Sequence, residues 1–164
     1  MLTRRVALSG AVRGLAAVAG ANLLKIPFAW SADADRVVHS DAEWRKMLTA
    51  NQYAILRKEG TEPPFSSPLV HEERRGTFAC AGCGLDLFSS TTKFDSGTGW
   101  PSFWAPLDNA VNTSEDRSFF MTRTAVTCRR CDGHLGHVFD DGPKPTGLRY
   151  CMNGLALTFK PATA

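Results

Sequence analysis

The sequence predicts a mainly β protein with antiparallel strands, preceded by short helices. From residue 77 onward, short runs rich in β-branched and aromatic residues alternate with the turn-forming residues Gly, Pro, Asp and Asn. Before that point, apolar residues recur at helical spacing behind a capping sequence. The chain has 164 residues, 43% hydrophobic and 21% charged, which fits one globular domain and argues against a disordered, collagen-like or polytopic membrane protein.

Residues 1–34 have the layout of an export signal, and 35–164 are predicted to form a single domain. Arg4-Arg5 precedes an apolar segment, as in a twin-arginine signal, and Ala32-Asp33-Ala34 resembles a cleavage site. Only eleven uncharged residues separate Arg13 from Lys25, whereas a membrane-spanning helix needs about 20. We expect export to the periplasm without stable membrane association; a cytoplasmic protein with a basic tail is the alternative.

Two helices are predicted before the strands. Ser40 and Glu43 form the S-x-x-E pattern of a capping box, and the apolar residues that follow at helical spacing predict a helix over 41–49. A second helical turn is predicted over 52–58. The segment 60–68 contains three prolines, which interrupt helices and strand ladders alike, so we expect a loop there.

The rest of the chain predicts six short strands, each bounded by turn residues. They are Thr77–Cys80, Leu85–Phe88, Phe119–Thr127, Gly136–Phe139, Leu148–Met152 and Ala156–Phe159.

The charge distribution argues against a nucleic-acid-binding protein. The net charge is +3, but four of the 19 basic residues and only one of the 16 acidic residues lie in 1–34. From residue 35 onward the two signs balance, whereas a nucleic-acid-binding domain presents a basic face. Arg129-Arg130 is only a local pair. We therefore expect no nucleic-acid partner.

Four of the five cysteines form two CxxC pairs, Cys80 with Cys83 and Cys128 with Cys131. Two residues between ligands let both thiolates of a tight turn face one point, and two such turns supply the tetrahedral sulfur set that Zn²⁺ prefers. We expect one zinc ion per chain in a structural role, because four thiolates leave no open position for a substrate. Two disulfides and a CxxC redox motif remain as alternatives.

The fifth cysteine, Cys151, has neighbours that could make it reactive. A single cysteine is most often a small buried hydrophobe. In a strand, however, Arg149 projects on the same face as Cys151, and a guanidinium favours the nucleophilic thiolate. His134 and His137 could supply protons near neutral pH, while Asp140-Asp141 either tunes a histidine or forms a turn. Cys151 and the two histidines therefore indicate cysteine–histidine chemistry in a β domain that a zinc site stabilises.

The segment Gly97–Trp104 is rich in glycine and tryptophan. Its glycines permit tight turns and close approach, and Trp100 and Trp104 present large rings. Both rings fit core packing or the wall of an apolar pocket, and their spacing does not decide between the two.

These motifs together resemble the methionine sulfoxide reductase B family over about residues 36–160. The matching segments are Cys80-x-x-Cys83, Phe94–Phe103, Cys128–Phe139, Asp141–Pro143 and Gly147–Asn153. The Gly-His-Leu-Gly-His and Arg-Tyr-Cys-x-Asn motifs are highly specific, especially in this order with two CxxC pairs. The resemblance implies two antiparallel sheets with short N-terminal helices and a structural zinc.

The resemblance also implies an activity, namely reduction of the R epimer of methionine sulfoxide, free or within proteins, to methionine. Cys151 would attack the sulfoxide sulfur as the nucleophile. His137 would give a proton to the sulfoxide oxygen, with His134 and Asp141 in support, because this oxygen leaves poorly unless protonated. Arg149 would help to hold Cys151 as a thiolate.

For substrate binding, the resemblance implies that Trp100 bounds a pocket for the methyl group, with Phe139 nearby and Asn153 in support. A thioether and its methyl group require an apolar, aromatic-edged pocket. No organic cofactor is implied. We expect the protein to act as a monomer.

One position departs from the commonest family pattern. Many members have a cysteine where Thr98 stands, and that cysteine resolves the sulfenic acid on the nucleophile by forming a disulfide. Every other cysteine of this chain belongs to a CxxC pair. We therefore predict a one-cysteine cycle, in which an external thiol, thioredoxin-like or glutaredoxin-like, reduces Cys151.

A second hypothesis is a non-enzymatic zinc-binding interaction module on the same scaffold. It predicts that Cys151 is unreactive and His137 dispensable. A pure binding module has no reason to keep Cys151, His134, His137 and Arg149 together.

Overall fold

The computed structural model describes residues 35–118 and 121–163. The predicted export signal over 1–34 lies outside the described residues. The elements, in chain order, are α1 (Asp41–Met47), α2 (Ala50–Lys58), β1 (Gly76–Cys80), β2 (Asp86–Ser89), β3 (Lys93–Phe94), β4 (Ser102–Phe103), β5 (Val111–Asp116), β6 (Arg123–Cys128), β7 (His134–Phe139), β8 (Arg149–Met152) and β9 (Leu157–Pro161). Short 3-10 turns cover Pro68–His71, Ser90–Thr92 and Gly154–Ala156.

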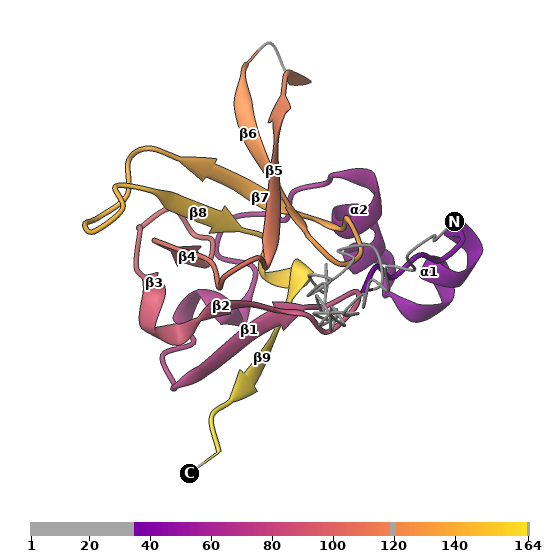
Figure 1. Ribbon diagram of the computed structural model, residues 1–164, viewed down its shortest axis with the longest axis horizontal. Coiled ribbons are helices and arrows are strands. Elements are labelled where there is room, and N and C mark those ends of the chain that lie inside the picture. The colour runs from indigo at the N-terminus through magenta and orange to yellow at the C-terminus, as the bar shows by residue number, and fades with distance from the viewer. Residues whose placement is uncertain (1–34, 119–120, 164) are drawn as a thin grey trace, which may run out of the picture. The chain divides into compact units, whose positions relative to one another are not determined.

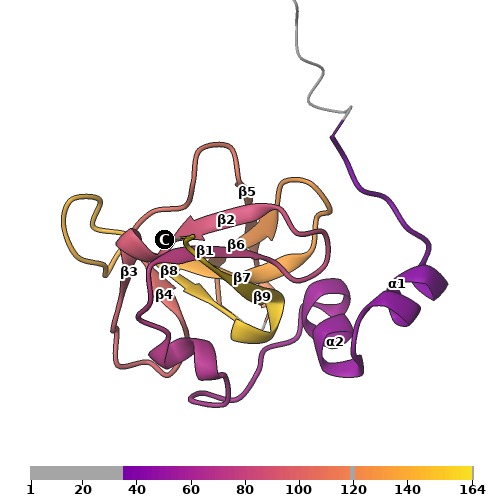
Figure 2. The same cartoon turned by 90° about the horizontal axis from the view of Figure 1, so that it is seen from below.

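Both helices begin with a capping box. Ser40 accepts from the backbone N–H of Glu43, whose carboxylate accepts from the Ser40 N–H in return. Thr49 and Gln52 repeat the arrangement at the start of α2. Figure 2 shows both helices lying to one side of the strands, and α2 contacts β7.

The strands form two antiparallel sheets, as the family resemblance implies. The smaller sheet has the order β2-β1-β9, and the larger has the order β3-β4-β8-β7-β6-β5 (Figure 1). Aromatic rings join them. Phe78 and Phe88, cross-strand partners in the smaller sheet, contact the Phe103 ring of β4 with centroid separations of 4.9 and 4.4 Å. All three rings are fully buried, so the core lies between the sheets.

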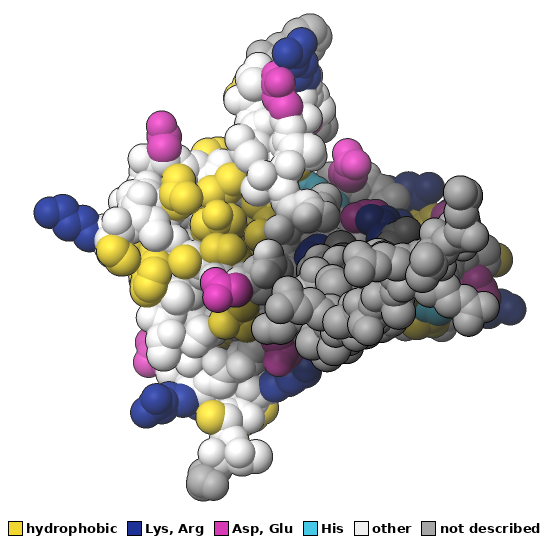
Figure 3. All heavy atoms as spheres, viewed as in Figure 1, with side chains coloured by type: hydrophobic (Ala, Val, Ile, Leu, Met, Phe, Trp, Pro, Cys, Tyr) yellow, Lys and Arg dark blue, Asp and Glu magenta, His cyan; other side chains and the backbone are white. Residues whose placement is uncertain are grey.

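Strands β5 and β6 project as a hairpin from the larger sheet (Figure 1). The four central residues of β5 are exposed, because this strand forms the edge of the sheet. On the face shown in Figure 3, hydrophobic side chains gather over β4, β7 and β8. No helix in the described ranges is both long enough and apolar enough to cross a bilayer.

The contact between β7 and β8 requires a glycine at position 136. A Cβ atom there would lie 2.1 Å from the carbonyl oxygen of Cys151 and 3.0 Å from the Cα atom of Met152. Both neighbours are backbone atoms of a central strand, so they have no room to yield. Gly136 thus allows β7 to pair with β8 at the position of Cys151.

The structure corrects several predicted boundaries. The second helix begins at Ala50 rather than at 52, because Thr49 caps it, and the pattern Thr49-x-x-Gln52 was the overlooked signal. The strand predicted over Phe119–Thr127 is β6, Arg123–Cys128; residues 119–120 are outside the described ranges.

Three strands escaped prediction. β3 and β4 have two residues each, too few for a pattern to appear. β5 is almost entirely polar, since it buries no face, and therefore lacks the alternation of a half-buried strand.

Candidate active site and metal centre

The four CxxC cysteines converge although the pairs are far apart in the chain. Their sulfur atoms all lie within 4.8 Å of one another. The Sγ atoms of Cys80 and Cys131 are 3.7 Å apart, and those of Cys83 and Cys128 are 3.5 Å apart. Sulfurs about 2.3 Å from a tetrahedral zinc ion are about 3.8 Å apart, whereas a disulfide requires about 2.0 Å. The spacing fits metal binding, and all five cysteines are free thiols.

The two cysteine turns have the same backbone design. In each turn, the residue four positions after the first cysteine donates its N–H to that cysteine's carbonyl, from Gly84 to Cys80 and from Asp132 to Cys128. Both donors have positive φ, 72° and 53°. Glycine adopts this conformation freely and aspartate tolerates it, which explains these residue types after each CxxC.

Helix α2 holds the second cysteine turn from outside. The Arg57 guanidinium donates to the carbonyl of Cys131 at 2.8 Å, and the same guanidinium lies over the Trp44 ring of α1. Leu56 approaches Gly133 so closely that a Cβ there would lie 2.9 Å from a Leu56 methyl group. The predicted N-terminal helices therefore pack against the cysteine cluster.

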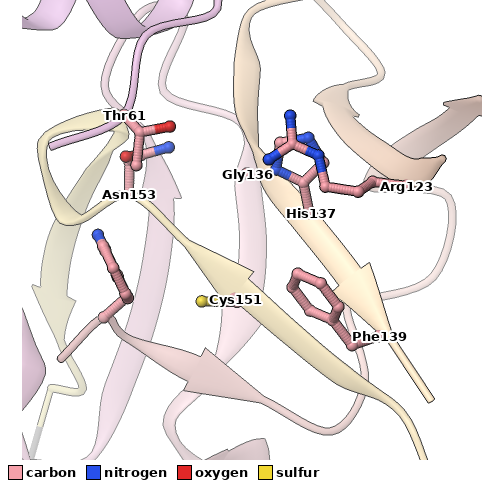
Figure 4. A pocket seen from close by; sticks show the side chains of 8 residues that line it. Thr61, Arg123, Gly136, His137, Phe139, Cys151 and Asn153 are labelled. Atoms are coloured by element: carbon pink, nitrogen blue, oxygen red, sulfur yellow. The ribbon is translucent and has the colours of Figure 1, made fainter. Parts of the chain in front are cut away.

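A second site is a cavity of about 140 Å³ around Cys151. The residues that line it come from β6, β7 and β8 of the larger sheet and from three loop positions outside the strands. They are Thr61, Trp100, Arg123, Gly136, His137, Phe139, Cys151 and Asn153. Figure 4 shows the sulfur of Cys151 between the Phe139 ring and the Asn153 side chain. Trp104, the second tryptophan of its segment, is not part of the lining.

Strand register places His137 beside Cys151. The two residues are direct cross-strand partners on β7 and β8, while Ser102 of β4 faces Cys151 from the other side. The nucleophile candidate and the proton-donor candidate therefore occupy the centre of the sheet, where the backbone is most restricted.

A β-bulge brings His134 to the same face as His137. In a regular strand, residues three apart point to opposite faces. Here Thr127 pairs with His134 and Val126 with Gly136, so Leu135 is the extra residue. The two imidazole rings consequently meet edge to face, with centroids 5.3 Å apart.

Asn153 stabilises this bulge. Its backbone N–H and its side-chain amide both donate to the carbonyl of Leu135, at 2.8 and 3.0 Å. The bulge frees this carbonyl from the strand ladder, and a buried carbonyl requires a donor. Asn153 is 3% exposed, and its role in the described structure is to fix β7 and the cavity wall together.

Burial controls the ionisation of Cys151. Burial raises the pKa of its thiol above the ordinary value, while Thr98 and Arg149 act in the opposite direction. Thr98 Oγ1 lies 3.9 Å from the sulfur. Arg149 thus favours the thiolate, as predicted for a neighbouring guanidinium, but in the free protein its influence is smaller than that of burial.

Arg149 interacts with three groups, namely Cys151, Asp141 and the Phe139 ring. Its guanidinium makes a two-pronged ion pair with Asp141, at 2.8 and 2.7 Å, and lies over the Phe139 ring at 4.5 Å. The Arg149 partner holds the pKa of Asp141 below its usual range. Asp141 therefore orients Arg149, whereas the sequence interpretation assigned it to support His137.

The carboxylate that contacts His137 is Asp116, which sequence reasoning missed. Its Oδ2 atom lies 2.8 Å from Nε2 of His137 and 2.6 Å from the Arg123 guanidinium. Nothing in the sequence marks Asp116, because it ends a polar edge strand far from the histidines. Only the hairpin, with Asp116 opposite Arg123, brings it to the site.

His134 is uncharged at neutral pH. Burial, aided by the nearby His137, lowers the pKa of His134 to about 4. The residue is 4% exposed, and its Nε2 atom has no hydrogen-bond partner in the described part of the chain. Of the two histidines, His137 is the one that lines the cavity.

Glu62 is a further residue that the sequence did not single out. It is 3% exposed, and its carboxylate accepts from the backbone N–H groups of Gly154 and Leu155 at 2.6 and 2.9 Å. Its own backbone donates to the Asn153 side chain and accepts from Nε1 of Trp100. One buried loop residue thereby positions Trp100 and Asn153, two of the three predicted substrate-binding residues.

Comparison with known proteins identifies a family for this arrangement. Residues 48–161 match the SelR domain. The chain is 58% identical over 120 residues to a protein of Pseudomonas putida strain W619, covering 73% of this chain and 90% of that one. It is 54% identical over 125 residues to a protein of Methanosarcina barkeri, covering 76% and 88%.

A third relative, from Bradyrhizobium diazoefficiens, is 54% identical over 128 residues, covering 77% of this chain and 92% of the relative. All three relatives are named peptide methionine sulfoxide reductase MsrB. The matched region contains both CxxC pairs and every residue that lines the cavity. The chain therefore belongs to the methionine sulfoxide reductase B family, whose domain is SelR.

Proposed function

We propose that this protein is a peptide-methionine (R)-S-oxide reductase, which reduces the R epimer of methionine sulfoxide, free or within proteins, to methionine. The observation that carries the proposal is the pairing of Cys151 with His137 across β7 and β8 in one aromatic-edged cavity. Such a reaction repairs a lesion that makes a flexible apolar side chain polar.

In the reductive step, the Cys151 sulfur attacks the sulfoxide sulfur, and the sulfur–oxygen bond of the substrate breaks. The oxygen ends on Cys151 as a sulfenic acid, so Cys151 is oxidised by two electrons and the substrate sulfur is reduced by two. The proton that the thiol loses is balanced by the one that the substrate oxygen gains. Burial raises the pKa of the Cys151 thiol, so it opposes the thiolate that Arg149 favours.

His137 is the proposed acid for the substrate oxygen. A sulfoxide oxygen is a poor leaving group without a proton, and His137 lies beside the nucleophile. His134 is neutral under the same conditions, so it supports the site as a packed partner rather than as an acid. Trp100 and Phe139 supply apolar walls for the substrate methyl group.

We further propose that an external thiol recycles the enzyme. The first thiol attacks the Cys151 sulfenic acid to give a mixed disulfide and water, and a second thiol releases Cys151 as a disulfide forms between the two reductants. Thioredoxin-like and glutaredoxin-like proteins fit this role. Thr98 occupies the position where many family members have the resolving cysteine, and its hydroxyl cannot form a disulfide with Cys151.

The cysteine cluster is proposed to hold one structural zinc ion. Cys80, Cys83, Cys128 and Cys131 would be the ligands, and the ion would supply folding free energy rather than chemistry.

For residues 1–34 we propose export by a twin-arginine route, supported by Arg4-Arg5 and the apolar stretch that follows. Such a route suits a domain that folds around a metal before transport.

We expect Cys151→Ser to lower the reduction of R-methionine sulfoxide by roughly 10³-fold or more with dithiothreitol as reductant, because a hydroxyl cannot replace the nucleophile. The wild type should consume the R epimer in preference to the S epimer. Chiral separation of the products measures both. Retained zinc and an unchanged melting temperature serve as the folding control. An active variant, or preference for the S epimer, would contradict the proposal.

Thr98→Cys should convert the protein into one that forms an internal disulfide. The Thr98 hydroxyl lies 3.9 Å from the Cys151 sulfur, so a cysteine there has its partner within reach. After substrate without added thiol, mass spectrometry should find one added oxygen on the wild type and a disulfide in the variant. Thr91→Cys, on an exposed turn, is the matched control and should behave as the wild type. An internal Cys151 disulfide in the wild type would refute the one-cysteine cycle.

Metal analysis should find about one zinc ion per chain, and a strong chelator should lower the melting temperature markedly. Cys83→Ser should bind less zinc and melt lower, since it removes one ligand of the cluster. Cys151→Ser is the matched control, because it changes a cysteine outside the cluster. A wild-type protein that has no metal, and whose four thiols are oxidised to disulfides, would exclude the zinc site.

Cell fractionation tests the export proposal. The protein should appear in the periplasm, and replacing Arg4 and Arg5 together by lysine should retain it in the cytoplasm. Arg13→Lys is the control with the same chemical change outside the pair. A wild-type protein confined to the cytoplasm would favour the alternative.

A further inference from the structure

The His137 ring is held by a carboxylate from a different hairpin. Asp116 Oδ2 lies 2.8 Å from Nε2 of His137, and their side chains are 20% and 12% exposed. In the described part of the chain, Asp116 is the one side chain that hydrogen-bonds this ring. The contact joins the end of β5 to β7 across β6, so three strands meet at it.

Asp116 is itself fixed by donors on two sides. The Arg123 guanidinium donates to Oδ2 at 2.6 Å, and the backbone N–H of Ser118 donates to Oδ1 at 2.8 Å. Hydrogen bonds from Ser118, followed by those from His137 and Arg123, hold the pKa of Asp116 well below its usual range. The group is therefore a carboxylate throughout the neutral range, and a carboxylate accepts hydrogen bonds without donating any.

A contact between an acceptor and a ring nitrogen fixes the proton on that nitrogen. Nε2 of His137 must carry a hydrogen, both in the imidazolium and in the neutral ring, as long as Asp116 faces it. The hydrogen that the ring can give up is then the one on Nδ1.

We propose that Asp116 is the positioning residue for His137, which it holds with Nε2 protonated so that the proton for the substrate oxygen leaves from Nδ1. This inference rests on the proposed reductase function. After the transfer, His137 is the neutral Nε2–H tautomer, and Nδ1 regains a proton from water once methionine has left.

The charges around the ring are consistent with this division of roles. Arg123 on β6 faces the ring from the hairpin, and its charge is offset by Asp116. The pKa of His134 on β7 is lowered by burial, and the Asp141 carboxylate is bound to Arg149 on β8. Asp116 therefore provides the negative charge in direct contact with His137.

Asp116→Asn provides the test. An asparagine has the same shape but no charge, and its amide can either accept from Nε2 or donate to it. Glu115→Gln is the matched control, since it neutralises the adjacent carboxylate of the same strand, which pairs with Arg117 at the surface. The full-length, zinc-loaded proteins are compared.

Nitrogen NMR of the imidazole, on reduced protein without substrate, reports the tautomer directly. We expect the Nε2–H tautomer in the wild type and in Glu115→Gln, and a mixture in Asp116→Asn. In Asp116→Asn, kcat should fall by about 10- to 100-fold, as for other residues that orient a reactive group, with little change in KM. Asp116→Glu should restore kcat in part.

Two results would overturn the proposal. One is a wild-type ring with the hydrogen on Nδ1. The other is an Asp116→Asn variant that melts at a lower temperature and loses kcat while keeping the wild-type tautomer, since a residue with a purely structural role would act in that way. A wild type that reduces no sulfoxide would refute the proposed function, whereas the NMR comparison would still decide whether Asp116 sets the His137 tautomer.

Discussion

The close contact between β7 and β8 at Gly136 is the constraint on which the site depends. A side chain at this position would collide with the carbonyl of Cys151, and without the contact His137 would not lie opposite Cys151. The adjacent bulge then adds His134 to the same face and leaves the Leu135 carbonyl for Asn153. The glycine at position 136 and the bulge at Leu135 thus determine the arrangement at the centre of the larger sheet. The β5–β6 hairpin then brings Asp116 into contact with His137.

A second framework surrounds this centre. The cysteine cluster joins two turns that are distant in the chain, and α2 supports the second of them through Arg57. Glu62 lies in the loop after α2 and uses both its carboxylate and its backbone to hold the far side of the cavity. The Glu62 carboxylate accepts from the backbone N–H groups of Gly154 and Leu155, which follow β8. These hydrogen bonds fix the loop that carries Glu62 against the chain just after β8.

Features that depend on residues close together in the chain could be predicted from the sequence. The capping box of α1 and the two CxxC pairs depend on residues close in the chain, so sequence spacing was sufficient to infer a helix and a four-sulfur cluster. The family resemblance supplied the two sheets and the grouping of Cys151 with His137. What escaped prediction depends on long-range register. The Asp116–His137 contact requires a hairpin and a strand pairing, and the assignment of Asp141 to Arg149 rather than to His137 requires knowledge of which face each strand presents.

With the proposed chemistry, Thr98 near the Cys151 sulfur would also affect the lifetime of the protein under oxidants. In the proposed cycle, a sulfenic acid on Cys151 has no second thiol in the site with which to condense. It stays exposed to further oxidation to sulfinic acid, which thiols do not reverse. Survival under peroxide is then a competition between the arrival of reductant and a second oxidation. The half-buried position of Cys151 slows both reactions, so the supply of thiol around the protein determines which of them prevails.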